Sequence, residues 1–189
     1  MDNVSIYRKN LIEAVLNLSE ANSWDAAVDE WEIDDVEEDE TLSESCVCGK
    51  ENLRYLFTIR NTYNGNTLFY IGSQCIKKFG RGDLDYEVTL KEKQFKLLHA
   101  IENNDFLELS PEYFSRNLLK YLYDIGAFKP TSYNDFNPYN DYAFMLDMFN
   151  KRNRTQAQEK KATAIILNSI RPFLRNMLYE KIRRNRIGR

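Results

Sequence analysis

Several residue types are scarce in this chain of 189 residues, and each scarcity excludes a class of protein. Only one histidine, His99, occurs, so a catalytic histidine cluster cannot be built. Seven glycines and four prolines are too few for a collagen-like or linker-rich chain, and they disfavour a many-turned all-β fold. The sequence contains no run of about 18 apolar residues, so it predicts no transmembrane helix. The first 20 residues also lack a signal peptide's apolar region, so we expect an intracellular, cytoplasmic protein.

Acidic and basic residues are unevenly distributed along the chain. Residues 1–49 carry 14 acidic and two basic groups, whereas residues 151–189 carry 12 basic and two acidic groups. Hydrophobic residues make up 43% of the chain, which is enough to predict a folded core. A chain with one acidic and one basic end can bind a second copy of itself, a basic partner or a polyanion. The alternative is that the two ends only form separate solvated faces.

The apolar pattern predicts an α+β fold that is mostly helical, with one small β-hairpin. A period of 3.6 residues predicts helices over residues 5–18, 24–31, 73–79, 89–103, 111–125, 141–149 and from 155 onwards. A period of two around Asn64-Gly65 predicts hairpin strands over residues 53–60 and 67–71. The acidic residues 32–44 are expected to be extended and partly mobile, and residues 129–140 to form a loop.

Three local signals fix the expected helix boundaries, and three segments follow from them. Thr89 with Glu92 forms a capping box, Pro111 suits a first helical position, and Pro172 must kink or divide the last helix. We predict an N-terminal helix with an acidic segment over residues 1–44 and a zinc-binding hairpin and helix unit over residues 45–104. A helical region with a basic C-terminus completes the chain over residues 105–189.

All three cysteines flank the predicted hairpin. Cys46 and Cys48 precede it as a Cys-x-Cys pair, and Cys75 lies in the first turn of the helix after it. Disulfides are disfavoured inside cells, and cysteines separated by one residue bridge each other poorly. Zinc favours thiolates, and a helix N-terminus stabilises the thiolate form. The order of knuckle, hairpin and helix predicts a treble-clef-like unit with a structural Zn²⁺, with small buried hydrophobic thiols as the alternative.

The fourth zinc ligand is a separate prediction. A structural zinc site usually has four protein ligands, and the only histidine lies opposite the apolar side of its helix. The economical ligand set is Cys46, Cys48, Cys75 and His99. Glu44, Asp83 or a water are the alternatives for the fourth position, and a surface histidine is the alternative for His99.

Residues 24–80 resemble a zinc-binding unit of small proteins in phages and mobile elements of Gram-positive bacteria. The resemblance lies in residues 31–33 (WEI), 46–50 (CVCGK), 59–61 (IRN), 64–66 (NGN) and 71–80 (IGSQCIKKFG). Such units often carry a histidine beside the knuckle, where this chain has Ser45 and Lys50. In size and charge layout the whole chain is also similar to phage proteins that act against host defence, including anti-CRISPR proteins.

This resemblance implies a non-enzymatic inhibitor that binds a host defence nuclease, with a type II CRISPR effector as the expected target class. Such a protein would block DNA loading or a required movement of the nuclease. Residues 25–44 contain 11 carboxylates and no basic residue, so they can present charge where phosphates normally lie; a solubilising segment is the alternative. The predicted partner-binding residues are Trp24, Asp29, Glu30, Asp34, Asp35, Glu37, Glu38, Asp39 and Glu40.

The second hypothesis is a nucleic-acid-binding phage accessory protein that uses the basic C-terminal helix. Basic side chains bind phosphates without reading sequence, although a solvated basic helix is the alternative. The residues concerned are Arg171, Arg175, Lys181, Arg183, Arg184, Arg186 and Arg189. Independently of this hypothesis, the loop aromatics Tyr133, Phe136 and Tyr139 are better candidates for partner contact than the helical aromatics, because loops tend to be exposed. No phosphate-binding glycine loop, nucleophile elbow or metalloprotease helix occurs in the sequence, so we do not expect an enzyme.

Overall fold

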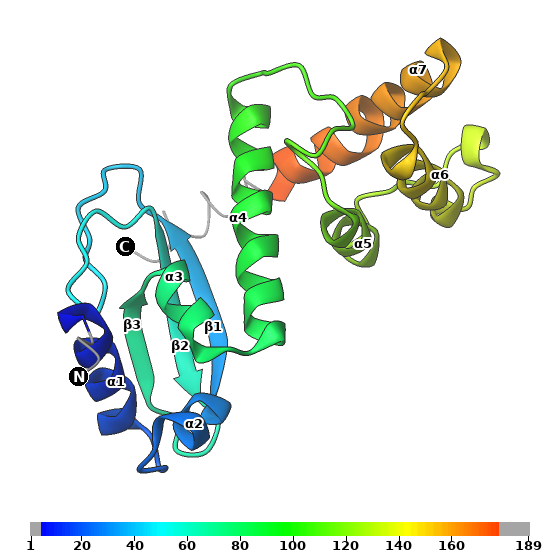
Figure 1. Ribbon diagram of the computed structural model, residues 1–189. Helices are drawn as coiled ribbons and strands as arrows, with labels where there is room; N and C mark the ends of the chain where they lie inside the picture. The colour runs from blue at the N-terminus through cyan, green and yellow to red at the C-terminus, as the bar shows by residue number, and fades with distance from the viewer. Residues whose placement is uncertain (1–4, 178–189) are drawn as a thin grey trace. The chain divides into compact units, whose positions relative to one another are not determined.

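The computed structural model describes residues 5–177, and the chain divides into two compact units, residues 1–92 and 93–189 (Figure 1). The fold is α+β and mostly helical, with one small antiparallel sheet, as the sequence predicts. None of the helices in the described part of the chain combines the length and the apolar composition needed to cross a bilayer.

Unit 1 contains the sheet and the shorter helices. Its elements are α1 (Ile6–Leu18), α2 (Trp24–Ala27), η1 (Val28–Glu30), β1 (Trp31–Glu38), β2 (Tyr55–Asn61), β3 (Thr67–Ile71), α3 (Ser73–Ile76), η2 (Lys77–Phe79) and the start of α4 (Gly82–Glu102). Figure 1 shows the three strands side by side, with α1 next to β3. The buried side chains of Trp31, Phe57, Ile59 and Ile71 form the centre of this unit.

The sheet has the order β1-β2-β3, and both neighbouring pairs are antiparallel. The hairpin β2–β3 confirms the prediction, and the acidic segment is extended as expected, but its first part forms a third strand, β1, that the sequence analysis did not predict. This strand pairs with β2 from Trp31 opposite Asn61 to Glu38 opposite Tyr55, with a bulge between Ile33 and Asp35. Trp31 and Val36 bury their side chains and β2 supplies the ladder, so eight residues rich in carboxylates still form an edge strand.

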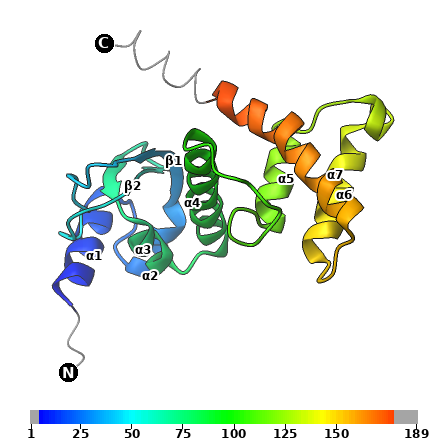
Figure 2. The same cartoon turned by 90° about the horizontal axis from the view of Figure 1, so that it is seen from above.

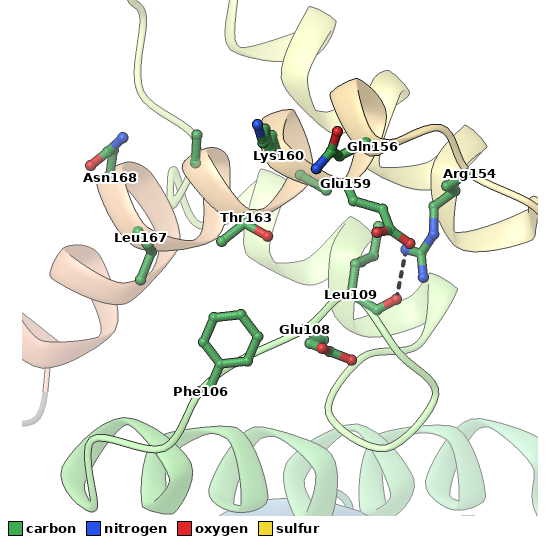
Figure 3. Close-up of a pocket in the computed structure, with 12 residues that line it drawn as sticks. Phe106, Glu108, Leu109, Arg154, Gln156, Glu159, Lys160, Thr163, Leu167 and Asn168 are labelled. Atoms are coloured by element: carbon green, nitrogen blue, oxygen red, sulfur yellow. Dashed lines mark hydrogen bonds between the residues drawn. The ribbon is translucent and has the colours of Figure 1, made fainter.

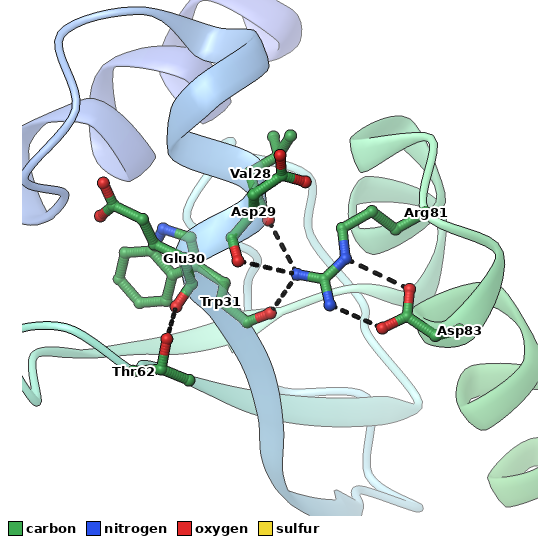
Figure 4. A network of polar contacts seen from close by, with 7 residues as sticks. All are labelled: Val28, Asp29, Glu30, Trp31, Thr62, Arg81 and Asp83. Carbon is green, nitrogen blue, oxygen red and sulfur yellow. Dashed lines mark hydrogen bonds and ion pairs between the residues drawn. The ribbon is translucent and has the colours of Figure 1, made fainter.

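A single guanidinium joins the start of β1 to the start of α4 (Figure 4). Arg81 Nη1 donates to the carbonyl oxygens of Val28 at 3.0 Å and Trp31 at 2.6 Å. Arg81 Nε and Nη2 donate to the two carboxylate oxygens of Asp83 at 3.2 and 2.6 Å. We call this guanidinium with its hydrogen bonds the Arg81 fork. Because it binds backbone carbonyl groups on one side and a carboxylate on the other, it fixes how the chain turns before α4.

The predicted start of α4 is wrong by about two turns, because the helix begins at Gly82. Thr89 lies inside it, and its hydroxyl donates to the Asp85 carbonyl at 2.8 Å, one turn back. Thr89 therefore bonds within the helix instead of capping it. Asp83 and Asp85 occupy the first turn, where carboxylates complement the helix dipole.

Unit 2 is helical in its described part. It holds the rest of α4, then α5 (Arg116–Asp124), η3 (Ser132–Asn134), α6 (Pro138–Asn150), α7 (Gln156–Ile165) and the π-helical segment η4 (Ile166–Ile170). Helical residues continue from η4 to 177. Figure 2 shows α5, α6 and α7 in this unit, and α6 contacts both α5 and α7. The buried side chains of the unit include Leu118, Leu122, Met145 and Ile166.

The helix boundaries of unit 2 follow the sequence signals in part. Thr155 and Gln158 form the capping box of α7, as the Thr-x-x-Gln pattern suggests. The prediction that Pro111 starts a helix is wrong, because α5 begins at Arg116 and is capped by the Ser115 hydroxyl. Pro172 does not divide the last helix, since the helix passes through it after the π-helical turn η4.

Candidate metal centre

Three buried thiols converge between the knuckle and the hairpin. The Sγ atoms of Cys46, Cys48 and Cys75 all lie within 4.8 Å of one another. Cys46 Sγ and Cys75 Sγ are 3.7 Å apart, far longer than the roughly 2.05 Å of a disulfide, and all three cysteines are free. The group can therefore hold a metal ion, as the Cys-x-Cys…Cys pattern predicts.

Backbone hydrogen bonds give the knuckle its shape. Cys46 N–H donates to the Lys50 carbonyl at 2.8 Å, and Gly49 N–H donates back to the Cys46 carbonyl at 2.7 Å. Gly49 has φ +93°, a conformation that favours glycine. The side-chain amide of Asn10, on α1, donates to the Cys48 carbonyl at 3.0 Å. The knuckle is thus held by its own turn and by the first helix.

The third thiol is positioned by the end of the hairpin. Gly72 precedes α3, and its N–H donates to Cys46 Sγ at 3.4 Å, while Cys75 N–H donates to the Gly72 carbonyl at 2.8 Å. A Cβ on Gly72 would lie 3.0 Å from a methyl carbon of Leu53. Glycine therefore leaves room for the Leu53 side chain next to the end of the hairpin.

The hydrogen bonds around the sulfur atoms favour one thiolate. A hydrogen bond from Cys75, aided by N–H donors that include Gly72, outweighs burial and lowers the pKa of Cys46 to about 5. The same hydrogen bond, together with burial, raises the pKa of Cys75. A cation bound to the group would stabilise all three as thiolates, because metal binding releases the ligand protons.

His99 is not a member of this group. It lies on α4 within residues 93–189, and its Nδ1 is 3.6 Å from a carboxylate oxygen of Glu102. Among residues 5–177 no carboxylate joins the three thiols either, so the fourth ligand stays a prediction. Cys46 and Cys75 line a cavity of about 180 Å³ that is also lined by Lys50, Arg54, Tyr55 and five other residues. This volume has room for a water or another small donor.

The structure places Glu30, one of the predicted partner-binding residues, in the interior. Its carboxylate accepts hydrogen bonds from Asn61 Nδ2 at 2.6 Å and from the N–H groups of Glu20 at 2.8 Å and Ala21 at 2.7 Å. Burial opposes the charge, but these hydrogen bonds outweigh it, so the pKa of Glu30 is lowered. Glu30 joins α1 to the sheet and offers no surface to a partner.

The other predicted contact residues fall into two groups. Trp24 is half-buried, with its ring edge-on to Phe79 at a centroid distance of 5.3 Å. Asp39 accepts hydrogen bonds from the N–H groups of Thr41 and Ser43 and so stabilises the turn after it. Glu38 Oε1 lies 3.7 Å from Arg54 Nε. The exposed carboxylates are those of Asp29, Asp34, Asp35, Glu37 and Glu40. Asp34, Asp35 and Glu37 lie on the edge strand β1, and we name them the acidic edge.

Only part of the predicted basic surface lies within the described residues. Arg171 Nη2 and Arg175 Nη2 both donate to Asn104 Oδ1, at 3.1 and 2.5 Å. Lys181, Arg183, Arg184, Arg186 and Arg189 lie outside the described residues. The sequence analysis did not single out Asn104. The sequence indicates it as a helix-capping residue, because it lies just after a predicted helix end and Asn tolerates positive φ there.

The loop aromatics are exposed, as the sequence suggested. Tyr133 and Phe136 lie in and next to η3, whereas Tyr139 lies in the first turn of α6, so the expected loop over residues 129–140 is wrong for its last residues. Beneath them the buried Asn134 donates to Asp141 Oδ2 at 2.7 Å and to the Lys129 carbonyl at 2.8 Å, so the segment is ordered.

A cavity of about 540 Å³ lies in unit 2 between residues 106–109 and the α7–η4 helix (Figure 3). Arg154 Nη1 closes one side by donating to the Leu109 carbonyl at 2.9 Å. In Figure 3, Glu159 lies on that side, whereas Phe106 faces the part of the helix that carries Leu167 and Asn168.

Comparison with protein-family models, with curated proteins and with solved structures finds no match to this chain. The metal centre, the acidic edge and the arginine pair are therefore interpreted from their own geometry. The resemblance to phage proteins remains a prediction.

Proposed function

We propose that this protein is a non-enzymatic, zinc-stabilised inhibitor that binds a basic, nucleic-acid-handling surface of a host defence nuclease. A type II CRISPR effector is the target class that the resemblance to phage proteins favours. The acidic edge carries the proposal, because Asp34, Asp35 and Glu37 are all exposed on an edge strand.

The spacing of the acidic edge supports mimicry of a nucleic-acid strand. Residues two apart in a β-strand lie on one face about 6.8 Å from each other, so β1 holds its carboxylates in a row, as a nucleic-acid strand holds its phosphates. Asp34 and Asp35 are adjacent at the bulge, and Glu37 follows two residues later. Only Asp34 has a nearby cation in the described residues, Arg60 Nε at 3.8 Å, so most of this charge is available to a partner. Bound there, the protein would compete with DNA loading.

The metal in this proposal is Zn²⁺ with a structural role. Tetrahedral zinc with Zn–S bonds of about 2.3 Å separates two ligand sulfur atoms by about 3.8 Å. The observed 3.7 Å between Cys46 Sγ and Cys75 Sγ agrees with this value, and three soft thiolates favour zinc over magnesium or calcium. Zinc would tie the knuckle to α3 and so hold the sheet that displays the acidic edge.

Co-elution of the purified protein with a type II effector–guide complex on a sizing column at physiological salt tests the proposal. We expect co-elution with the complex alone, and less of it when the complex is first loaded with target DNA. Separate elution in the absence of DNA would contradict the proposal.

A matched pair of variants tests whether the acidic edge makes the contact. Asp35→Asn with Glu37→Gln should weaken binding by about tenfold and lower its salt dependence, since exposed charges set association. Glu13→Gln with Glu51→Gln removes two exposed charges elsewhere in unit 1 and should leave binding unchanged. Equal affinity of both double variants would exclude the acidic edge as the contact surface.

A further inference from the structure

Arg171 and Arg175 meet at one neutral oxygen atom. Both Nη2 atoms donate to Asn104 Oδ1, at 3.1 and 2.5 Å. No ion pair joins either guanidinium to a carboxylate anywhere in residues 5–177, and Arg171 Nε is buried without a hydrogen-bond partner there. Two like charges one helical turn apart repel each other unless an anion lies between them. The site therefore carries two positive charges and spare donors.

The position of Asn104 is fixed by the end of α4. Its N–H donates to the Ile101 carbonyl at 3.2 Å, and Asp105 N–H donates to the Ala100 carbonyl at 2.8 Å. With φ +58° at Asn104, this is the Schellman arrangement that closes a helix. The backbone at Asn104 is thus fixed, and its amide oxygen binds both guanidinium groups without neutralising them.

The helix that carries the arginines has a rare distortion next to the site. The π-helical segment η4 ends at Ile170, directly before Arg171. Such segments are uncommon and are found frequently at functional sites. The extra residue in this turn sets the rotation of the following residues, and so the direction in which Arg171 and Arg175 project.

An exposed aromatic ring lies close in sequence to Asn104, the partner of both arginines. Phe106 is 70% exposed and is two residues from Asn104, so their Cα atoms are at most about 7 Å apart. It borders the 540 Å³ cavity on the side of Leu167 and Asn168 (Figure 3). Glu108 and Glu159 also line that cavity. An exposed ring beside cationic groups is the arrangement with which proteins bind single strands, by base stacking and phosphate contacts.

We propose that Arg171, Arg175 and Asn104 bind a phosphate of a single-stranded nucleic acid and that Phe106 stacks on a neighbouring base. The phosphate lies between the two guanidinium groups and supplies the negative charge that no carboxylate of residues 5–177 supplies there. The inference is independent of the proposed nuclease inhibition, because it concerns unit 2 and is tested with nucleic acid alone.

The experiment measures binding of the full chain to a labelled oligothymidine of about 12 nucleotides by fluorescence anisotropy over a salt series. Arg171→Gln with Arg175→Gln should lower the slope of log K against log salt by about 0.7, because the pair contacts one phosphate of a single strand, and should weaken binding at least about tenfold. Arg152→Gln, which removes an exposed charge elsewhere in unit 2, should lower affinity far less. A double variant that binds no more weakly than this control would overturn the proposal.

Phe106→Ala should weaken binding at least about fivefold with an unchanged salt slope, because stacking releases no counterions. Phe136→Ala is the matched control, since Phe136 is 72% exposed on another surface of unit 2. An equal effect of both variants would overturn the stacking role of Phe106. Equal affinity for a duplex, or competition by inorganic phosphate as effective as by the oligonucleotide, would overturn the assignment to single strands.

The Asn104→Asp variant distinguishes a phosphate-binding site from a contact that only stabilises the end of α4. Aspartate also tolerates positive φ, and its carboxylate would pair with both arginines. We therefore expect an unchanged or higher melting temperature together with at least about tenfold weaker binding. Unchanged binding by this folded variant would show that the arginine pair only fastens the end of α4, and would overturn the proposal.

Discussion

Cys46 shows how a single sulfur atom can be prepared for a metal by its neighbours. Its Sγ lies 3.7 Å from Cys75 Sγ and accepts a hydrogen bond from the Gly72 N–H, and both neighbours belong to the end of the hairpin and the helix after it. The same geometry that favours its thiolate also sets the distance to the next ligand. The cysteine spacing predicts this group because a Cys-x-Cys turn and a helix N-terminus are both local structures. The fourth ligand depends on tertiary placement, and sequence spacing alone does not fix that.

Cys75→Ser should abolish stoichiometric metal binding and lower the stability of unit 1. If free zinc normally exceeds its dissociation constant about a thousandfold, the loss is about 4 kcal/mol. Metal analysis of the purified protein and a thermal melt measure both effects. Ser45→Ala, next to the knuckle and exposed, is the control that should change neither. Full metal content and an unchanged melting temperature in Cys75→Ser would disprove the site.

Glu30 gives a pH dependence with a defined sign. The pKa of its carboxyl is lowered in the folded state from the ordinary value of 4.5, because the three hydrogen bonds outweigh burial. Its stabilisation is therefore complete above about pH 4.5 and is lost as the pH falls through the lower, folded-state pKa. The sequence does not distinguish this buried carboxylate from its exposed neighbours, since all lie in one acidic run.

Glu30→Gln should destabilise the protein by about 1–3 kcal/mol at pH 7, because one amide oxygen cannot accept all of the hydrogen bonds. The difference in melting temperature between this variant and the wild type should shrink below pH 4.5. Thermal melts between pH 3 and pH 7 test the prediction, and a difference that grows on acidification would contradict it.

Among the secondary-structure elements, β1 and α4 were the hardest to predict from sequence. Carboxylates have low strand propensity, and β1 forms because Trp31 and Val36 are buried and β2 offers a ladder. The start of α4 is set by the Arg81 fork, which contacts carbonyl groups 50 or more residues away in sequence. The hairpin and the α7 cap were predictable because their signals, Asn64-Gly65 and Thr155 with Gln158, act within a few residues.

Arg81→Lys should cost about 1–3 kcal/mol of unfolding free energy, since an ammonium cannot hold the Val28 and Trp31 carbonyls and bind Asp83 through two parallel hydrogen bonds. Chemical denaturation measures the loss. Arg60→Lys alters an exposed pair with Glu32 and should cost less than about 1 kcal/mol. Equal losses would show that the fork has no special role.

For the whole molecule, the division into two units means that the metal need not support the entire chain. The three thiols all lie in residues 1–92, and the helical core of α5, α6 and α7 lies in residues 93–189. Each unit has its own buried apolar side chains. Stability in such a chain is therefore expected to be local, with separate cooperative units.

Removal of the metal with a zinc chelator should expose the backbone of unit 1 and leave unit 2 protected. Hydrogen exchange read out by mass spectrometry should show faster exchange over β2, β3 and α3 and unchanged exchange over α5 and α6. Simultaneous loss of protection in both units would contradict this prediction. A chelator has no effect on Cys75→Ser if that variant already lacks the metal, which provides the control.

The π-helical turn η4 gives the last helix one place where its length can change without moving the arginine pair. Removing one residue between Ile166 and Ile170 would convert this turn into regular α-helix. A π-helical turn holds about one residue more than an α-helical turn, so Arg171 and Arg175 would keep nearly the same direction toward Asn104. The same deletion in the regular helix over Gln156–Ile165 would instead rotate everything after it by about 100°, the angle of one residue. A one-codon deletion in this helix therefore keeps or destroys the basic site according to whether it falls inside η4 or before it.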